Sequence, residues 1–301
     1  MQQSMLVNGP NISLGEFFTE NYYPYIKSYK KTYSHDWYTF YKNLFPSFGQ
    51  TNLCDIMSRD VDIWIAKQVS AGYKNSTILK HLVLLKRIMR VAVRWDFINS
   101  DSAVNNHRRI SIGEPRQRFL TPKEIAQLVY SCYESSHPFL GSVVELLILT
   151  GARCGEIRLA TWRNIDLDGD RLFVPISKNG KKRTIFLSEN AKKIIKTLRF
   201  KSEALALPIS LNAFLITNPQ TGRPYNDFQA AFKKARDNAG IRDVRIHDLR
   251  HTYASLLVQN GVTLYEVQKL LGHSSPNMTQ RYAHLNDTSL KQIVNNLPTF
   301  L

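Results

Sequence analysis

The sequence predicts a mainly α-helical protein with one small β-sheet, divided into two domains. Residues 11–100 repeat apolar positions at helical spacing and contain no strand or hairpin signal. Residues 101–118 lose this periodicity, are polar and basic, and are typical of a linker. Residues 119–301 return to helical spacing, apart from two β-rich runs that flank Asn179-Gly180, a dipeptide that favours a hairpin.

The first domain is expected to begin with a capping box, in which Ser13 precedes Glu16 by three residues. Its clearest helix spans Asn75–Trp95, where one apolar stripe is made of Ile78, Leu82, Leu85, Ile88 and Met89. The basic residues of this helix then lie on its other faces: Lys80, Lys86, Arg87, Arg90 and Arg94. On this segment alone, an ordinary solvated surface is the simplest interpretation of those charges.

The second domain is expected to open with another capping box, formed by Thr121 and Glu124 around Pro122 at the first helical position. The run "FLGSVVELLILTG" then predicts a buried helix, because it is too short to span a bilayer and contains Glu145. More helical segments follow the hairpin. A last apolar stripe predicts a C-terminal tail helix, with Leu290, Ile293, Val294 and Leu297 on one face.

The net charge of +16 favours a polyanionic partner, with nucleic acid ahead of an anionic membrane surface. The excess is spread along the chain, with +6 over residues 1–112 and +10 over the remainder. The three cysteines are far apart and form no CxxC pair, which suits a reducing cytoplasm and excludes a cysteine-based zinc site. The N-terminus has no signal-peptide pattern.

One segment, "HDLRHTYAS", places three chemically active side chains on one helix face, because His247, Arg250 and His251 are spaced i, i+3, i+4. Two histidines at this spacing can bind zinc. However, Asp248 stands where the glutamate of such a helix would be, and Arg250 would place a fixed cation beside the metal. The set suits a phosphate better, although on this segment alone an ordinary helix N-terminus, with a capping His247 and a surface arginine, is the favoured interpretation.

Four further residues have similar chemical potential, and each also has a structural interpretation. Arg153 follows a turn after an apolar helix, and an ion pair with Glu156 would explain it. Lys178 precedes the Asn-Gly turn within a generally basic tip. His273 and Tyr282 lie nine residues apart, and a tyrosine becomes a nucleophile towards phosphorus when its proton is removed and the developing charge is stabilised. With 14 tyrosines in the chain, a structural role is the simpler interpretation of any one of them.

Taken together, these residues supply every role in phosphoryl transfer to a protein oxygen without a metal. The set consists of a nucleophile, cations for the non-bridging oxygens, a proton acceptor and a proton donor: Arg153, Lys178, His247, Arg250, His273 and Tyr282.

The segments that carry these residues resemble the tyrosine recombinase (phage integrase) family. They are "TGARCGEI", "ISKNGKKRTIFL", "HDLRHTYAS", "LGHSS" and "TQRYAHL", in the order and at the separations of that family. The resemblance covers roughly residues 115–290. It implies a helical core-DNA-binding (SAM-like) domain over residues 11–100, a linker over 101–118, and a mixed α/β catalytic domain over 119–301.

The resemblance implies a mechanism as well as a fold. Tyr282 would attack a DNA phosphate, forming a 3′-phosphotyrosine and releasing a 5′-hydroxyl. Arg153 and Arg250 would bind the non-bridging oxygens with help from His273. Lys178 would give a proton to the leaving oxygen, and His247 would accept the tyrosine's proton or bind the phosphate. Glu156 and His251 match supporting positions, and neither cofactor, metal nor ATP is implied.

The partners implied are double-stranded DNA, further copies of the chain in a tetramer that exchanges strands through a Holliday junction, and accessory DNA-bending proteins. A membrane is not implied, and the expected location is the cytoplasm, at the nucleoid. The helix Asn75–Trp95 is the candidate for groove contact. The tail helix would pack on its own domain or on a neighbouring protomer. Only about a dozen residues precede the first helix, which favours an enzyme without an arm-binding domain.

Two other functions fit the same sequence. A type IB-like topoisomerase would use this chemistry to relax DNA without exchanging strands. A catalytically silent DNA-binding accessory protein would have the fold without the reaction, although the complete set of six residues argues against it.

Overall fold

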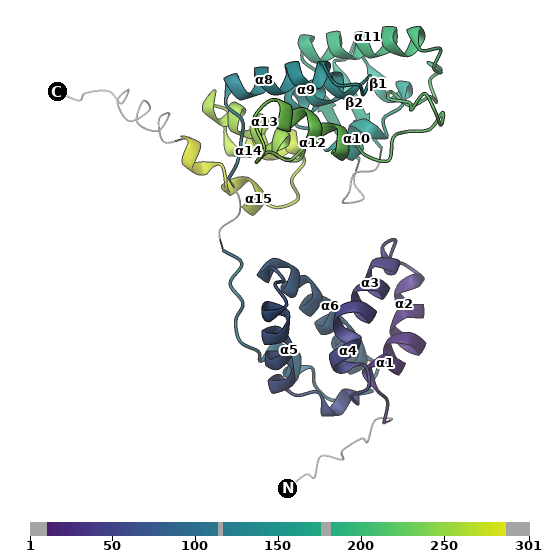
Figure 1. Ribbon diagram of the computed structural model, residues 1–301, viewed down its shortest axis with the longest axis vertical. Helices are drawn as coiled ribbons and strands as arrows, with labels where there is room; N and C mark the ends of the chain where they lie inside the picture. The colour runs from purple at the N-terminus through teal and green to yellow at the C-terminus, as the bar shows by residue number, and fades with distance from the viewer. Residues whose placement is uncertain (1–10, 114–116, 176–181, 287–301) are drawn as a thin grey trace, which may run out of the picture. The chain divides into compact units, whose positions relative to one another are not determined.

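The computed structural model describes residues 11–113, 117–175 and 182–286 and divides the chain into two compact units (Figure 1). The units comprise residues 1–115 and 116–301, so the division falls inside the predicted linker. Each unit has its own hydrophobic core. The predicted fold class, mainly α-helical with one small sheet, is confirmed. Among the described residues, no helix is long and apolar enough to cross a membrane.

The regular elements of the first unit are all helical over its described residues, apart from one isolated β-bridge between Ser13 and Asn52. Two of its helical stretches are continuous through a π-helical turn, at Phe18–Tyr22 and at Phe40–Leu44. A 3₁₀ turn covers Leu53–Asp55. The α-helices are α1 (Leu14–Phe17), α2 (Tyr23–Lys27), α3 (Tyr33–Thr39), α4 (Phe45–Phe48), α5 (Ser58–Ser70), α6 (Asn75–Arg94) and α7 (Ser102–Asn105).

Aromatic stacking and the long helix α6 form the core of this unit. Phe18 and Phe40, at the starts of the two π-helical turns, stack with ring centroids 3.7 Å apart and planes 7° from parallel. Helix α6 buries nine of its 20 residues, including all five of the predicted stripe. The predicted capping box is present, since Ser13 and Glu16 exchange side-chain and backbone hydrogen bonds.

The predicted linker is in part a packed segment of the first unit. Helix α7 lies within residues 101–118, and Val104 is fully buried in the core. One helical turn is too short to show a periodicity in the sequence, and for this reason the segment reads as irregular.

The second unit has eight described α-helices and three strands, with 3₁₀ turns at Trp162–Asn164 and Ala283–Asn286. The helices are α8 (Pro122–Tyr133), α9 (Leu140–Thr150), α10 (Cys154–Arg158), α11 (Glu189–Ala204), α12 (Gln229–Asn238), α13 (Asp248–Gln259), α14 (Leu264–Leu271) and α15 (Asn277–Gln280). The strands are β1 (Ile165–Asp166), β2 (Arg171–Val174) and β3 (Arg183–Phe186).

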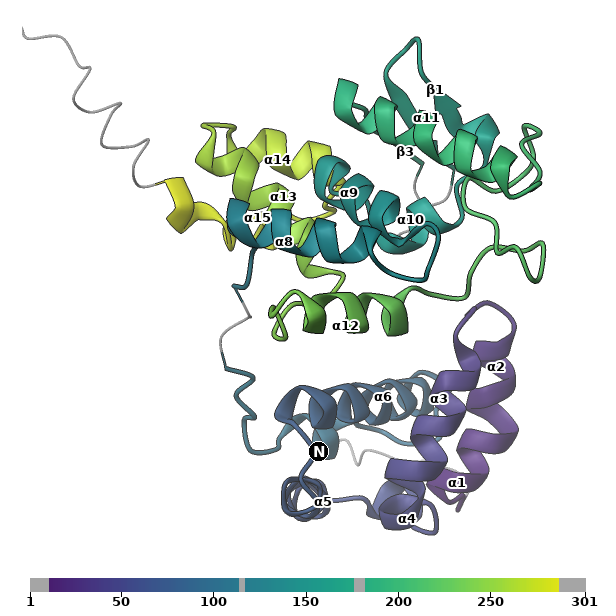
Figure 2. The same ribbon diagram turned by 45° about the horizontal axis from the view of Figure 1, so that its top comes forward.

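Helix α9 lies at the centre of the second unit, where α8, α11 and α13 pack against it (Figure 2). It is the apolar run of the sequence, and nine of its 11 residues are buried, as predicted. The capping box at the start of α8 is also present, with Thr121 accepting from the backbone of Glu124.

The sheet is antiparallel in the order β1-β2-β3. Strands β2 and β3 pair from Arg171 with Phe186 to Val174 with Arg183, so the two β-rich runs do face each other. Residues 176–181, which include Lys178 and the Asn-Gly turn, lie outside the described residues, as do residues 287–301, which include the predicted tail helix.

Candidate active site

Two glycines of the quoted segments end helices that point at the candidate site. Gly151 ends α9 with φ 60°, and Gly272 ends α14 with φ 63°. These left-handed conformations suit glycine and stop each helix, which leaves its last carbonyl groups without an intrahelical donor. The ends of α9 and α14 therefore present partial negative charge to a neighbouring cation.

The side chain of Arg250 occupies that position. One terminal nitrogen donates to the carbonyl of Gly151 at 2.6 Å, and the other donates to the carbonyl of Leu271 at 2.5 Å. The residue is only 4% exposed. Burial, together with the nearby cations Arg153 and Arg183, lowers the pKa of Arg250 to about 10. The guanidinium is still charged at neutral pH and is held in one plane by two helix ends.

Glu156 joins two more arginines to this centre. Its carboxylate accepts from the Arg153 guanidinium at 3.0 Å and from Arg183 at 2.7 and 3.2 Å. It also caps α10 by accepting from the backbone N–H of Arg153 at 2.8 Å. Burial raises the pKa of Glu156, but the Arg183 and Arg153 hydrogen bonds outweigh it and leave the pKa below its usual value.

His273 follows the end of α14 and lies within the field of the same cations. Its Nδ1 lies 2.8 Å from the hydroxyl of Thr279, a buried residue on α15. Burial, together with Arg250 and Arg153, lowers the pKa of His273 to about 4. The ring is therefore neutral at pH 7, when one nitrogen donates and the other accepts.

The start of α13 carries the two other histidines. His247 is the N-cap residue, and its ring packs edge-on against that of His251, with centroids 5.3 Å apart. Burial, His247 and Arg281 lower the pKa of His251 to about 4. Both rings belong to one helical face, as the i, i+4 spacing predicts.

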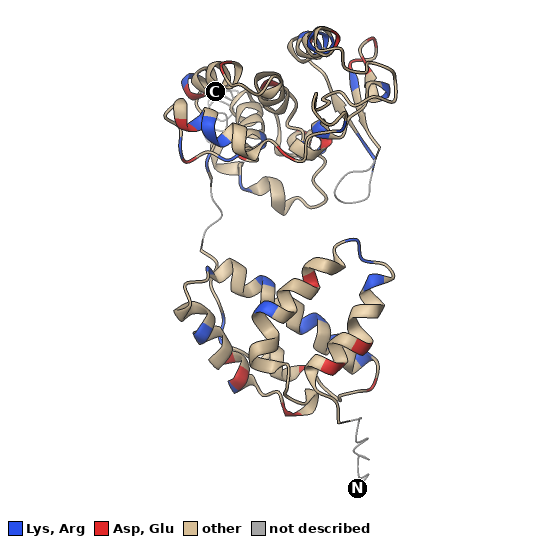
Figure 3. Cartoon of the chain, turned by 45° about the vertical axis from the view of Figure 1, so that its right-hand side comes forward, with Lys and Arg blue, Asp and Glu red and all other residues tan. Residues whose placement is uncertain are grey.

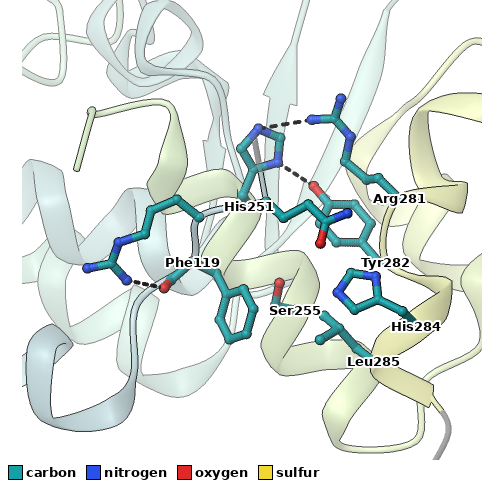
Figure 4. A pocket seen from close by; sticks show the side chains of 9 residues that line it. Phe119, His251, Ser255, Arg281, Tyr282, His284 and Leu285 are labelled. Atoms are coloured by element: carbon teal, nitrogen blue, oxygen red, sulfur yellow. Dashed lines mark hydrogen bonds between the residues drawn. The ribbon is translucent and has the colours of Figure 1, made fainter. Parts of the chain in front are cut away.

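Tyr282 is buried, and its hydroxyl lies 2.5 Å from Nδ1 of His251 (Figure 4). Its ring belongs to a small apolar cluster with Val258 and Leu271. Burial raises the pKa of Tyr282 to about 12, while the charges of Arg281 and Arg250 lower it. The phenol is protonated at pH 7 but lies within the electrostatic reach of two arginines.

The structure brings together the five described residues of the predicted set: Arg153, His247, Arg250, His273 and Tyr282. Arg153 and Arg250 lower the pKa of His273, and the charge of Arg250 acts to lower that of Tyr282. His247 joins the group through its packing against His251, which contacts the Tyr282 hydroxyl. The sixth, Lys178, lies outside the described residues.

Sequence reasoning missed two arginines of this centre. In the sequence Arg183 follows the lysines of the basic hairpin tip, but in the structure it lies on the inward face of β3. Strand alternation could have found it, because Ile185 and Leu187 are buried and share its face. Arg281 gave no signal beyond its place next to Tyr282. Its guanidinium lies 3.3 Å from Nε2 of His251.

Within the described ranges, no group of three or more His, Cys, Asp or Glu side chains is arranged to hold a metal ion. His247 and His251 lie beside Arg250 and Arg281 instead.

Solved integrase structures share this fold. A Tn1549 transposon integrase, in complex with transposon right end DNA, has a TM-score of 0.76 at 17% identity, covering 95% of this chain and 99% of that one. A lambda integrase dimer bound to a COC′ core site has a TM-score of 0.72 at 23% identity, covering 89% of this chain and 97% of that one. This chain therefore has the same fold as these integrases.

The chain belongs to the phage integrase family, whose model matches residues 118–289. The integrase of Salmonella phage P22 is 30% identical over 226 residues, which are 72% of this chain and 56% of that protein. The ICEBs1 integrase of Bacillus subtilis is 23% identical in an alignment of 299 positions that covers 92% of this chain and 80% of that protein. The chain thus spans a little over half the length of the P22 relative. The family predicted from the sequence is confirmed.

Proposed function

We propose that the chain is a site-specific DNA recombinase whose nucleophile is Tyr282. In this reaction the tyrosine oxygen bonds to a DNA phosphorus, the 5′-oxygen leaves as a hydroxyl, and a 3′-phosphotyrosine results. A 5′-hydroxyl from a partner strand reverses the step, and strands are exchanged through a Holliday junction without metal or ATP. One observation carries the proposal: the Tyr282 hydroxyl lies within reach of the charges of Arg250 and Arg281.

The phosphate would be bound by Arg153, Arg250 and His273. A guanidinium has five N–H donors in a fixed plane. Two donors of Arg250 bind the carbonyls of Gly151 and Leu271, which orients the others. Such prearranged donors stabilise the charge that develops on the non-bridging oxygens without reorganisation during the reaction.

Proton transfer would involve two further residues. Because the pKa of Tyr282 is about 12, its proton needs an acceptor at neutral pH. We assign this role to His247, which lies beside the ring that contacts the hydroxyl. We assign the proton for the leaving 5′-oxygen to Lys178, on the resemblance of the hairpin segment to the family.

Duplex DNA would contact both units, since Lys and Arg are distributed over each of them (Figure 3). In the first unit we propose the groove between α3 and α6, lined by Lys30, His35, Lys80 and Arg87. Lys30 and Arg87 are held there by Asp36. Phosphate contacts of this kind would give an affinity that falls steeply with salt.

Assembly on DNA would follow the pattern of structural relatives, which include a lambda integrase tetramer bound to a Holliday junction. We propose the same homo-tetramer for this chain, acting at the nucleoid in the cytoplasm, with DNA-bending proteins as helpers. The tail with Leu290 and Ile293 would pack on its own or a neighbouring protomer.

A nicked suicide substrate tests the proposed nucleophile. The substrate is a duplex built on attachment-like repeats beside the gene, with a nick next to the cleavage position. We expect the wild type and the control Tyr265→Phe, at a tyrosine 64% exposed on α14, to form an adduct that survives denaturant. Tyr282→Phe should bind the DNA equally well and form none. An adduct with Tyr282→Phe would show that this residue is not the nucleophile.

The same preparation separates the alternative functions. A type IB-like topoisomerase would relax supercoiled DNA that lacks the repeats. A silent accessory protein would bind without any adduct in the wild type. Recombination only between paired repeats supports the proposal.

A further inference from the structure

His251 lies between Tyr282 and Arg281 and contacts each with a different ring nitrogen (Figure 4). Nδ1 is 2.5 Å from the tyrosine hydroxyl, and Nε2 is 3.3 Å from a terminal nitrogen of Arg281. Each ring nitrogen therefore has a partner. If one nitrogen of the neutral imidazole accepts a hydrogen bond, the other carries the proton and donates.

The donor rules decide the direction of both hydrogen bonds. A guanidinium can only donate, so Nε2 of His251 has to accept from Arg281 and carries no proton. A neutral imidazole carries its single proton on the other nitrogen, which here is Nδ1. The ring is neutral at pH 7, because its pKa is lowered to about 4 by burial, by His247 and by Arg281.

We propose that Arg281 is a positioning residue that holds His251 in the Nδ1–H tautomer, so that His251 donates to the Tyr282 oxygen and does not take its proton. The catalytic part of this inference rests on the proposed role of Tyr282 as nucleophile. The tautomer itself does not depend on that role.

This tautomer gives His251 a defined part in both directions of the reaction. During cleavage the Tyr282 O–H bond breaks, the proton passes to His247, and the new bond to phosphorus forms. The Nδ1–H of His251 then stabilises the negative charge that builds on the tyrosine oxygen. During rejoining the phenolate is the leaving group, and the same donor stabilises it as the bond to phosphorus breaks.

The charge of Arg281 acts in the same sense as its hydrogen bond. It lowers the pKa of Tyr282 and that of His251. His247, Asp248 and Arg250 also affect the pKa of the His251 ring, and His251 in turn acts to lower the pKa of His273. Asp248 raises the pKa of His251, whereas the three cationic or imidazole neighbours lower it, so the ring stays neutral.

Nitrogen-15 NMR of the full chain, labelled at histidine, determines which ring nitrogen of His251 carries the proton. A protonated and an unprotonated ring nitrogen resonate far apart, and the His251 signals are assigned by their loss in His251→Gln. We expect a proton on Nδ1 in the wild type and in Arg281→Lys, which keeps a cationic donor. In Arg281→Met we expect the proton to move to Nε2. A wild-type proton on Nε2, or no change in Arg281→Met, overturns the proposal.

Single-turnover cleavage of the nicked substrate tests the consequence. We expect Arg281→Met to cleave roughly 10- to 100-fold more slowly at unchanged DNA affinity, the range seen when the partner that orients a functional histidine is removed. Arg281→Lys should recover most of the rate. Equal rates in all three proteins overturn the positioning role. Failure of the proposed function is distinct, because it appears as an adduct in Tyr282→Phe, whatever the tautomer.

Discussion

The two sides of the candidate active site are held by different kinds of contact. The arginine cluster, made of Arg153, Arg183, Arg250 and Glu156, is fixed by ion pairs and by backbone carbonyls at the ends of helices α9 and α14. The tyrosine segment, residues 277–286, consists of a four-residue helix and a 3₁₀ turn. The hydroxyl of Tyr282 in this segment contacts the imidazole of His251.

Because of this difference, substitutions on the two sides should affect the stability of the fold and the rate of the reaction to different extents. The arginine cluster joins α9, α10, α14 and β3, so a change there disturbs the packing of the second unit as well as the phosphate site. The tyrosine segment contributes one ring to a small apolar cluster, so a change at its hydroxyl should alter the reaction and leave the fold nearly unchanged.

The largest effect on cleavage is expected for Arg250→Lys, a change in the arginine cluster. A lysine has one ammonium group and cannot bridge the carbonyls of Gly151 and Leu271 while it also binds a phosphate in a plane. We expect cleavage of the nicked substrate to fall on the order of 10²- to 10³-fold. Arg242→Lys, at an exposed position, is the matched control. A loss of only a few-fold would place Arg250 outside the phosphate site.

Stability measurements compare the two sides directly. Glu156→Gln leaves Arg183 and Arg153 without their carboxylate, and we expect the free energy of unfolding to fall by about 3 kcal/mol. Tyr282→Phe removes one hydrogen bond and should cost about 1 kcal/mol. Urea unfolding measures both, and equal losses would contradict the distinction.

The carboxylate's contribution should also depend on pH with a defined sign. Because the pKa of Glu156 is lower in the folded chain, its contribution is present above the unfolded pKa and is lost as the pH falls through the folded value. Glu156→Gln should therefore be less sensitive to acid than the wild type.

Protonation of two histidines should have a smaller effect on stability. His251 contacts the tyrosine segment, and His273 lies beside the arginine cluster. The pKa values of His251 and His273 are about 4 in the folded chain, against about 6.5 for an unperturbed histidine. Between these values the unfolded chain binds more protons, so stability should decline as the pH falls from about 6.5 to about 4. The slope is at most about 1.4 kcal/mol per pH unit for each ring, and partial exposure reduces it. His251→Gln/His273→Gln should show a flatter profile in urea unfolding; an unchanged profile would contradict the shifts.

The smallest effect is expected from metal removal. Arg250 and Arg281 occupy the surroundings of the histidines that would otherwise suit a metal, so cleavage should proceed at the same rate in EDTA. Loss of activity in EDTA that returns with a divalent ion would revive the interpretation of His247 and His251 as metal ligands.

Much of the architecture could be predicted because it depends on local patterns. The capping boxes at Ser13 and Thr121, the stripe of α6, the buried α9 and the paired strands all have short-range signals. Helix α7 could not be predicted, because a single turn shows no periodicity and its burial depends on distant residues.

Most residues of the candidate site could be predicted from the sequence, but the contacts between them could not. The segments that resemble the family identified Arg153, Arg250, His273 and Tyr282, which the fold brings together, and His247, which packs against His251 beside them. Arg183 was hidden because the lysines before it made the whole run look like a solvated tip. The contact of Arg281 with His251 spans 30 residues and has no local signature.

The sequence by itself determined the longer helices and the order of the chemically active segments, since these follow from interactions between near neighbours in the chain. Only the tertiary structure decided that Arg250 binds carbonyls 99 and 21 residues away, and that His251 receives Arg281 on one nitrogen and faces Tyr282 with the other. The reason is physical: a buried polar group must find its partner wherever packing brings one, and packing joins segments that the sequence keeps apart.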